Sequence, residues 1–199
     1  MSFLILIQHI PNDLPYSRSF YQKQFLSEAE LHEIIDLLKD RWKDLVILMA
    51  YSGLDLAEAI NLTWDHIDKK NNMIVRERDK IRNNKMKKKV VTRRIPIRGE
   101  LEKMLRRRFK DRKLGDKNIF HFVSENCSDL KKDGQPLKYA NRMFQWDWKQ
   151  AQEKSSVEWN VRVKDLRHFF GSTMLNRGAD SLEIANQMGH QDLNMLRER

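Results

Sequence analysis

The chain has 199 residues, of which 40% are hydrophobic and 33% are charged. This length allows one domain with a hydrophobic core, and this composition excludes a disordered chain. The formal net charge is +10 and the isoelectric point is near 9.7. Such a charge favours an anionic partner, although solubility alone also explains many small basic proteins.

The first residues and the single cysteine indicate the compartment. Cys127 alone excludes an internal disulfide and a cysteine-rich zinc site, and it suits a reducing environment. The apolar run near the start is too short for a signal or membrane segment, and no basic residue precedes it. We therefore expect a cytoplasmic protein. Residues 1–24 hold Pro11 and Pro15 and are expected to form an arm or linker before a domain over residues 25–199.

The first half of this domain is expected to hold two helices, a short helix and a hairpin. Ser27 and Glu30 form a capping-box pattern ahead of apolar residues at spacings of three and four, which predicts a helix to about Asp40. A second apolar helix should end at Gly53, where a residue without Cβ adopts the left-handed turn. A short helix is expected over 54–64. Strands over 73–77 and 90–97 should pair across a long basic loop.

The second half of the chain shows helical periodicity. Apolar residues at spacings of three and four predict helices over 99–112, 137–152, 165–178 and 181–189. We therefore expect a mostly α domain with a small antiparallel β-sheet, an α+β fold.

The positive charge is concentrated in one segment. Residues 76–113 hold eighteen lysines and arginines and five acidic residues, a net charge of +13, whereas the other 161 residues sum to −3. A charge spread for solubility would not be so local, and counterion release from a phosphate backbone would benefit from it. Residues 106–108 add a second arginine cluster on the next helix. The hairpin side chains expected to bind DNA are Lys85, Lys87, Lys88, Lys89, Arg93 and Arg94.

Three further stretches, in a fixed order around this hairpin, carry recognisable motifs. Residues 52–68 read SGLDLAEAINLTWDHID, residues 164–170 read KDLRHFF and residues 188–190 read MGH. In this order they resemble the catalytic domain of the tyrosine recombinase (phage integrase) family, whose first motif is T-G-[LM]-R-x-x-E-[LA]-x-x-L-x-W-x-D-[IV]-[DN]. The matching residues in that motif are Gly53, Leu54, Glu58, Leu62, Trp64, Asp65 and Ile67.

The resemblance implies phosphoryl transfer, in which a tyrosine attacks a DNA phosphate and forms a 3′-phosphotyrosine. The negative transition state needs donors, and arginine binds phosphate through two N–H groups. By resemblance, Arg167 is a clamp arginine, Lys164 shares its helix face, and His190 is a further donor. A hairpin lysine would be the general acid, Lys80 as first choice and Lys85 as second. We interpret His168 as structural.

The sequence departs from the family at two places. Asp55 stands where the family has its first arginine, and one missing donor costs about 3–4 kcal/mol of barrier. Asp55 also suits the cap of the short helix that follows, and the two roles are compatible. The tyrosines are Tyr16, Tyr21, Tyr51 and Tyr139, so none follows position 139. We therefore expect an integrase-type catalytic domain, truncated near the expected nucleophile and inactive in this chain.

Other functions stay open at this point. One alternative is a degenerate recombinase that acts only as a DNA-binding or regulatory module. A basic helical RNA-binding protein is a weaker one, because the hairpin strands hold no aromatic residue for base stacking. The expected partner is double-stranded DNA, and a homo-oligomer on DNA stays open. We expect no membrane, small-molecule substrate, metal or cofactor.

Overall fold

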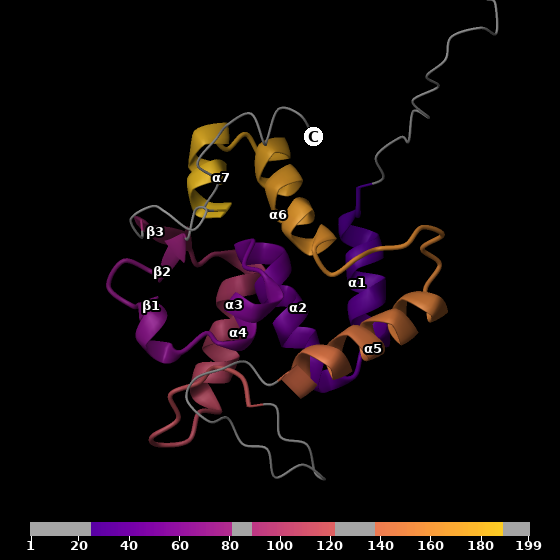
Figure 1. The fold of residues 1–199 in the computed structure, drawn as a ribbon, viewed down its shortest axis with the longest axis horizontal. Coiled ribbons are helices and arrows are strands. Elements are labelled where there is room, and N and C mark those ends of the chain that lie inside the picture. The colour runs from indigo at the N-terminus through magenta and orange to yellow at the C-terminus, as the bar shows by residue number, and fades with distance from the viewer. Residues whose placement is uncertain (1–24, 81–88, 122–137, 189–199) are drawn as a thin grey trace, which may run out of the picture.

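The protein was analysed as a computed structural model, which describes residues 25–80, 89–121 and 138–188. These residues form a mostly helical fold with one three-stranded antiparallel sheet of order β1-β2-β3, which confirms the expected fold class (Figure 1). The α-helices are α1 (Glu28–Leu37), α2 (Asp40–Ser52), α3 (Leu56–Ile60), α4 (Gly99–Lys110), α5 (Lys138–Lys154), α6 (Asp165–Asn176) and α7 (Ser181–Met188). The strands are β1 (Ile67–Asp68), β2 (Met73–Lys80) and β3 (Lys89–Pro96), and a 3-10 turn, η1 (Trp64–His66), precedes them.

The first two helices have the expected ends. The capping box of α1 is present, because Ser27 Oγ accepts from the backbone of Glu30 and the Glu30 carboxylate accepts from the backbone of Ser27. This helix ends at Leu37, three residues before the expected end, because Leu38 is extended (φ −74°, ψ 152°). α2 ends as expected before Gly53, which is left-handed at φ 65°.

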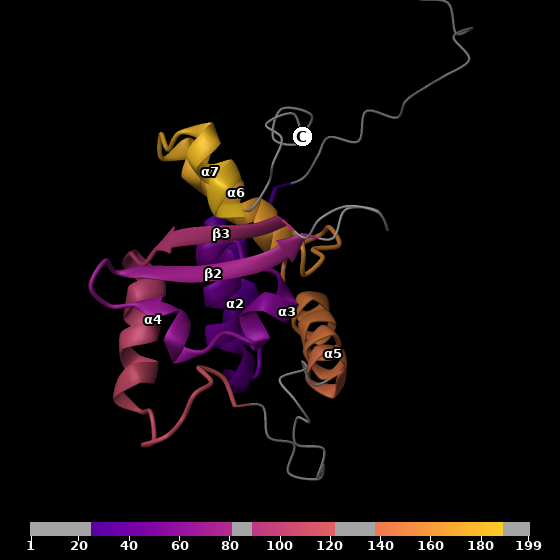
Figure 2. The same ribbon diagram turned by 60° about the vertical axis from the view of Figure 1, so that its left-hand side comes forward.

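The hairpin is confirmed; β2 runs three residues further than expected, and β3 has the expected length but begins one residue earlier. β2 and β3 pair in a register that sets Ile74 opposite Ile95 and Arg76 opposite Arg93. Both isoleucines are buried, so these four residues lie on the inner face of the sheet. Figures 1 and 2 show the sheet between α7 above and α4 below. The short strand β1 and the turn η1 were not predicted.

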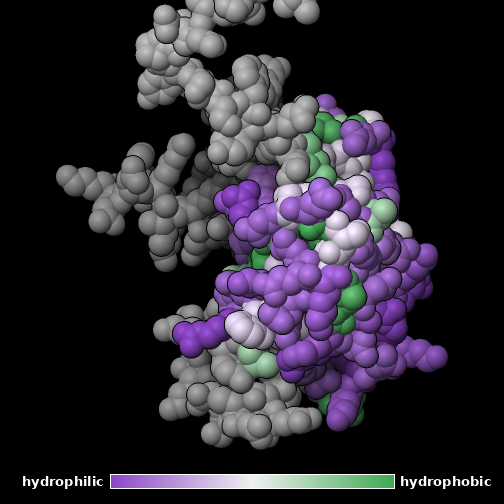
Figure 3. Space-filling model, turned by 90° about the vertical axis from the view of Figure 1, so that its right-hand side faces the viewer, coloured by the Kyte–Doolittle hydropathy of each residue, from purple (hydrophilic) through white to green (hydrophobic). Residues whose placement is uncertain are grey.

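The surface over α1 and α5 is mostly hydrophilic. Figure 3 shows this face with apolar residues as small separate spots among polar ones. None of the helices that the structure describes is both long and apolar enough to cross a bilayer.

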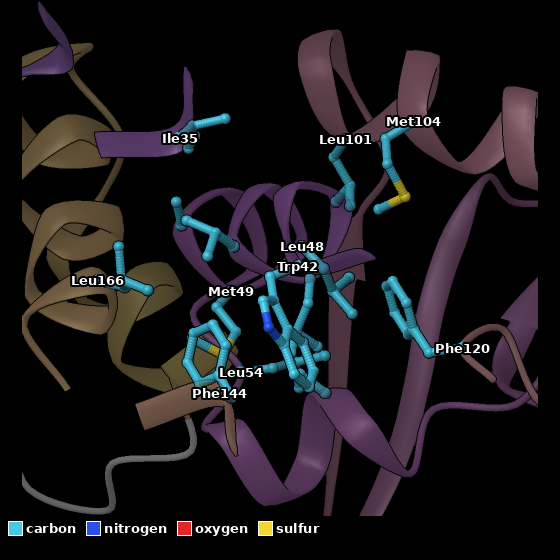
Figure 4. Packing of buried hydrophobic residues seen from close by; sticks show 14 of the residues in the cluster. Ile35, Trp42, Leu48, Met49, Leu54, Leu101, Met104, Phe120, Phe144 and Leu166 are labelled. Carbon is cyan, nitrogen blue, oxygen red and sulfur yellow. The ribbon is translucent and has the colours of Figure 1, made fainter. Parts of the chain in front are cut away.

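The core is built around α2. This helix is buried at most of its positions and contacts α1, α3, α4 and α6. Trp42 lies at the centre of Figure 4, with its ring centroid 5.4 Å from that of Phe144, edge to face. The indole Nε1 of Trp42 donates to Asp147 Oδ2 at 2.6 Å, which satisfies the buried polar atom of the ring. This packing fixes the start of α2 against α5.

A smaller apolar cluster joins the last two described helices. Phe170 of α6 packs with Ile184 and Met188 of α7. Gly171 allows this approach, because a Cβ at that position would lie 3.2 Å from Met188 Sδ. The cluster holds the end of α7 beside β3 and beside the turn after α2.

Candidate phosphate-binding site

The turn after α2 presents a fixed backbone carbonyl. Gly53 is left-handed, and its backbone is so close to Phe170 that a Cβ would lie 2.6 Å from Phe170 Cδ1. The carbonyl oxygen of Gly53 accepts from Arg167 Nη1 at 2.7 Å and from Arg93 Nη2 at 3.3 Å. Two guanidinium groups from α6 and β3 therefore meet at one oxygen atom.

Asp55 is the N-cap of α3, as one of its two interpretations predicted. Its Oδ1 accepts from Glu58 N at 2.8 Å, and Glu58 Oε2 accepts from Asp55 N at 3.0 Å. This capping box satisfies two backbone N–H groups at the start of the helix. The position that carries an arginine in the family motif thus carries a carboxylate with a structural role.

Arg167 and Lys164 lie together at the start of α6. Lys164 is the exposed N-cap residue, and Arg167 follows in the first turn with 18% of its side chain exposed. Besides Gly53, Arg167 donates through Nη2 to the carbonyl of Met188. Two backbone carbonyls from distant segments therefore fix its guanidinium. Lys164 and Arg167 thus stand three residues apart at the start of α6, and their shared face toward a phosphate stays a prediction.

The start of α6 is anchored by Asp165. Its carboxylate accepts from the backbone N–H of Arg162 at 2.8 Å and from the Arg162 guanidinium at 2.9 and 3.0 Å. Burial raises the pKa of Asp165, but the bonds from Arg162 outweigh burial and hold this pKa below its usual value. Asp165 therefore stays ionised and sets the backbone on which Lys164 and Arg167 stand.

Arg93 does not lie on the surface as expected, and this prediction is wrong. Its side chain is 1% exposed, because position 93 faces inward with Ile95. The guanidinium donates to Glu58 Oε2 at 2.7 Å and to the carbonyl of Gln187 at 2.7 Å, besides Gly53. Its neighbour Arg94, on the outer face, is exposed. Strand alternation, which the sequence pattern contained, separates the two arginines.

The remaining candidates on the hairpin and after α7 are not placed. Lys85, Lys87, Lys88 and His190 lie outside the described residues. For Lys80 and Lys89 the described part is the backbone, which pairs them across the end of the β2–β3 ladder. Their roles stay predictions.

The arginine cluster expected on α4 is engaged by acidic residues. Arg106 pairs with Glu102, and both Arg107 and Arg108 pair with Asp44 of α2. These ion pairs tie α4 to α2 and neutralise part of its charge.

Glu58 is the charged residue at the centre of the site, and its role was missed. Its Oε2 accepts from Arg93 and lies 3.9 Å from Arg167 Nη1, and its carbonyl accepts from Arg76 Nη1 at 2.7 Å. Its place in the family motif and the inward phase of Arg76 on β2 were the available signals. Among the residues that the structure describes, no three His, Cys, Asp or Glu side chains gather as a metal site.

The model of the phage integrase family matches residues 24–199. This chain belongs to the phage integrase family. A search of curated protein sequences found no match.

Solved structures of phage integrase relatives share the fold. A Tn1549 transposon integrase in complex with a circular intermediate DNA is 18% identical, with a TM-score of 0.60, over 92% of this chain and 63% of that chain. XerA recombinase is 22% identical, with a TM-score of 0.60, over 88% of this chain and 59% of the XerA chain. The catalytic domain of bacteriophage HP1 integrase is 20% identical, with a TM-score of 0.55, over 87% of this chain and 84% of that chain. The fold is therefore that of a tyrosine recombinase catalytic domain. The chain spans less than two thirds of the Tn1549 integrase and XerA chains.

Proposed function

We propose that this chain supplies the DNA-binding catalytic domain of a phage-type integrase, a site-specific tyrosine recombinase that breaks and rejoins DNA through a 3′-phosphotyrosine. The observation that carries the proposal is the geometry of Arg167. This motif residue is partly exposed and is held by the carbonyls of Gly53 and Met188, next to the exposed Lys164. A guanidinium fixed before the ligand arrives binds a phosphate without paying for its own reorganisation.

Charge and surface support DNA as the partner. The segment of net charge +13 includes the hairpin, whose outer face carries Arg94. One stripe of α5 is also exposed and holds polar, basic and aromatic residues suited to phosphates and base edges. Its members are Arg142, Gln145, Trp146 and Lys149. The Tn1549 and lambda integrases that share this fold were solved bound to DNA.

We further propose that residues 1–199 bind DNA but do not cut it. Asp55 occupies the position of the first clamp arginine and is engaged in capping α3. Its carboxylate repels a phosphate where an arginine would bind one. No tyrosine follows Tyr139 in these residues, so the expected nucleophile is not among them.

A DNA-binding or regulatory module without catalysis is the second candidate. The specific observation in its favour is the reciprocal bond of Asp55 with Glu58, which gives the aspartate a structural purpose. This candidate predicts duplex binding by the product of the complete reading frame, again without strand cleavage.

Salt dependence tests the binding. Fluorescence anisotropy with a duplex of about 30 bp should show affinity falling by about a thousandfold between roughly 50 and 200 mM salt, as for about six phosphate contacts. Replacing Lys87 and Lys88 by Gln should lower the salt slope by about two. The control replaces Lys43 and Lys103, which pair with acidic neighbours, and removes the same charge. A flat salt response, or equal effects of both double variants, would refute binding through the hairpin.

Covalent trapping tests the chemistry. A pool of nicked duplexes of random sequence is incubated with residues 1–199 and, separately, with the product of the complete reading frame. We expect no covalent protein–DNA adduct on denaturing gels from residues 1–199, and an adduct from the complete product where it supplies the tyrosine. No adduct from either protein supports the binding module, and an adduct from residues 1–199 contradicts the proposed inactivity.

A further inference from the structure

Arg93 and Arg167 compete for one carboxylate in the site. Glu58 Oε2 lies 2.7 Å from Arg93 Nη1 and 3.9 Å from Arg167 Nη1. Both guanidinium groups also donate to the Gly53 carbonyl, so they are held side by side. Glu58 is therefore shared between the two arginines, with the shorter contact to Arg93.

All three side chains are largely buried, so the way in which Glu58 is shared affects the charge of the site. The side chains are 1% exposed for Arg93, 11% for Glu58 and 18% for Arg167. A carboxylate with so little access to water must be compensated by a neighbouring cation. If Arg93 lost its charge, Glu58 would turn to the guanidinium that already lies 3.9 Å away. Arg167 would then be neutralised by its own protein, in competition with a phosphate.

We infer that Arg93 is a positioning residue that draws Glu58 toward itself, keeps it from closing on Arg167 and so preserves the attraction of Arg167 for a phosphate. The inference rests on the proposed function, since it concerns the phosphate that Arg167 would bind. Arg93 itself, at 1% exposure and with donors on three protein oxygens, does not replace the arginine missing at position 55.

The contribution of Arg167 can be read as a ratio of dissociation constants. The dissociation constant for a duplex of about 30 bp at roughly 50 mM salt is measured with Arg167 present and with Arg167→Met, in each background. The ratio is the constant with Met divided by the constant with Arg. In the wild-type background the ratio should be about ten, as for one charge-assisted contact. In the Arg93→Met background it should fall to about one. Adding Glu58→Gln should restore it to about ten, because the competing charge is gone.

Rescue by a second substitution separates positioning from structural damage. Loss of packing at position 93 would not be repaired by Glu58→Gln. Arg41→Met is the matched control, since Arg41 also pairs with a buried carboxylate, that of Asp147, and the Arg167 ratio should stay near ten. A ratio near ten in Arg93→Met, or a ratio that Glu58→Gln leaves near one, overturns the inference.

Three further outcomes are decisive. If Arg93→Met does not fold, Arg93→Lys takes its place. The lysine keeps a positive charge beside Glu58, so the Arg167 ratio should stay near ten. A ratio near one in Arg93→Lys overturns the inference. A wild-type ratio near one overturns it as well and leaves DNA binding intact. Absence of any duplex binding by the wild-type chain refutes the proposed function, and the inference falls with it.

Discussion

Two regions of this molecule bring a pair of arginines to one carboxylate, and they do so in different ways. At Asp44 the arginines are sequence neighbours on α4, Arg107 and Arg108, with side chains 58% and 25% exposed. At Glu58 they are Arg93 of β3 and Arg167 of α6, far apart in sequence and largely buried. The second pair also binds backbone carbonyls of a turn and of the end of α7.

The difference teaches what each cluster does. In the Asp44 cluster the carboxylate is also buried, with its side chain 12% exposed, but its arginines reach water, which shares the compensation of charge. The Glu58 cluster has little water, so its geometry is set by protein groups and its charges depend on one another. A site built for an anionic ligand needs this second kind of order, because the donors must be in place before the ligand binds.

The largest expected effect comes from removing Arg93 from the Glu58 cluster, measured against the loss of one arginine from the Asp44 cluster. Arg93→Met leaves Glu58 without its closest cation and should lower the free energy of unfolding by about 3–5 kcal/mol. Arg107→Met removes a mostly exposed partner of Asp44 and should cost about 0.5 kcal/mol. Urea unfolding at neutral pH measures both. Equal losses would contradict the contrast between the two clusters.

The turn at Gly53 belongs to the Glu58 cluster alone, and changing it should leave the Asp44 cluster intact. Gly53→Ala places a methyl group in a left-handed residue against buried Phe170, 2.6 Å away. The expected loss is about 2–4 kcal/mol, from backbone strain and overpacking together. Gly115→Ala is the control, because Gly115 is left-handed at φ 89° with no atom within 4 Å. Its loss should be about 1 kcal/mol, from strain alone; a similar loss at both positions would show that Phe170 yields.

A third carboxylate, Asp147, extends the comparison to the dependence of stability on pH. Burial raises the pKa of Asp147, but bonds from Lys39, Arg41 and Trp42 outweigh it and hold this pKa below its usual value. A carboxyl with a depressed folded-state pKa stabilises the protein above about pH 4, and this contribution is lost as the pH falls through the folded-state pKa.

Asp147→Asn should therefore lower the free energy of unfolding at pH 7 by about 2 kcal/mol and flatten its slope below about pH 4. Denaturant unfolding between pH 7 and pH 2 measures both changes. Asp68→Asn is the comparison, since the pKa of that exposed carboxyl is also lowered, by hydrogen bonds from Asn71. An unchanged slope in Asp147→Asn would refute the assignment.

Most of the fold could be predicted because its signals are local. The capping box at Ser27, the glycine after α2 and the two strand-forming runs of the hairpin each act within a few residues, and each is present. Strand β1 is two residues long and owes its existence to pairing with β2, which no local pattern encodes.

The site was predictable only in part, because its order comes from contacts between distant segments. Arg167 and Lys164 follow from motif and helical spacing. The carbonyls that hold Arg167 lie 114 and 21 residues away in the chain, and no sequence pattern places them. Arg93 was expected at the surface because a run of basic residues hides the strand phase that turns one of them inward.

The smallest effect concerns Asp55, whose bond to Glu58 joins the α3 cap to the arginine pair. Asp55→Ala removes the side-chain acceptor for Glu58 N and should cost about 1 kcal/mol of stability. Asp55→Ser keeps an N-cap oxygen and should lower stability by only a few tenths of a kcal/mol. Both variants remove one negative charge beside the proposed phosphate position, so both should tighten duplex binding at low salt to the same extent.

Thermal unfolding and anisotropy, run on the same two variants, separate the roles of this aspartate. If stability falls in Asp55→Ala alone while affinity rises in both, capping and repulsion are independent functions of one carboxylate. If affinity rises in neither, the carboxylate does not face the bound phosphate. The loss of the first family arginine would then act only through the missing donor, and the Glu58 cluster would hold the whole electrostatic character of the site.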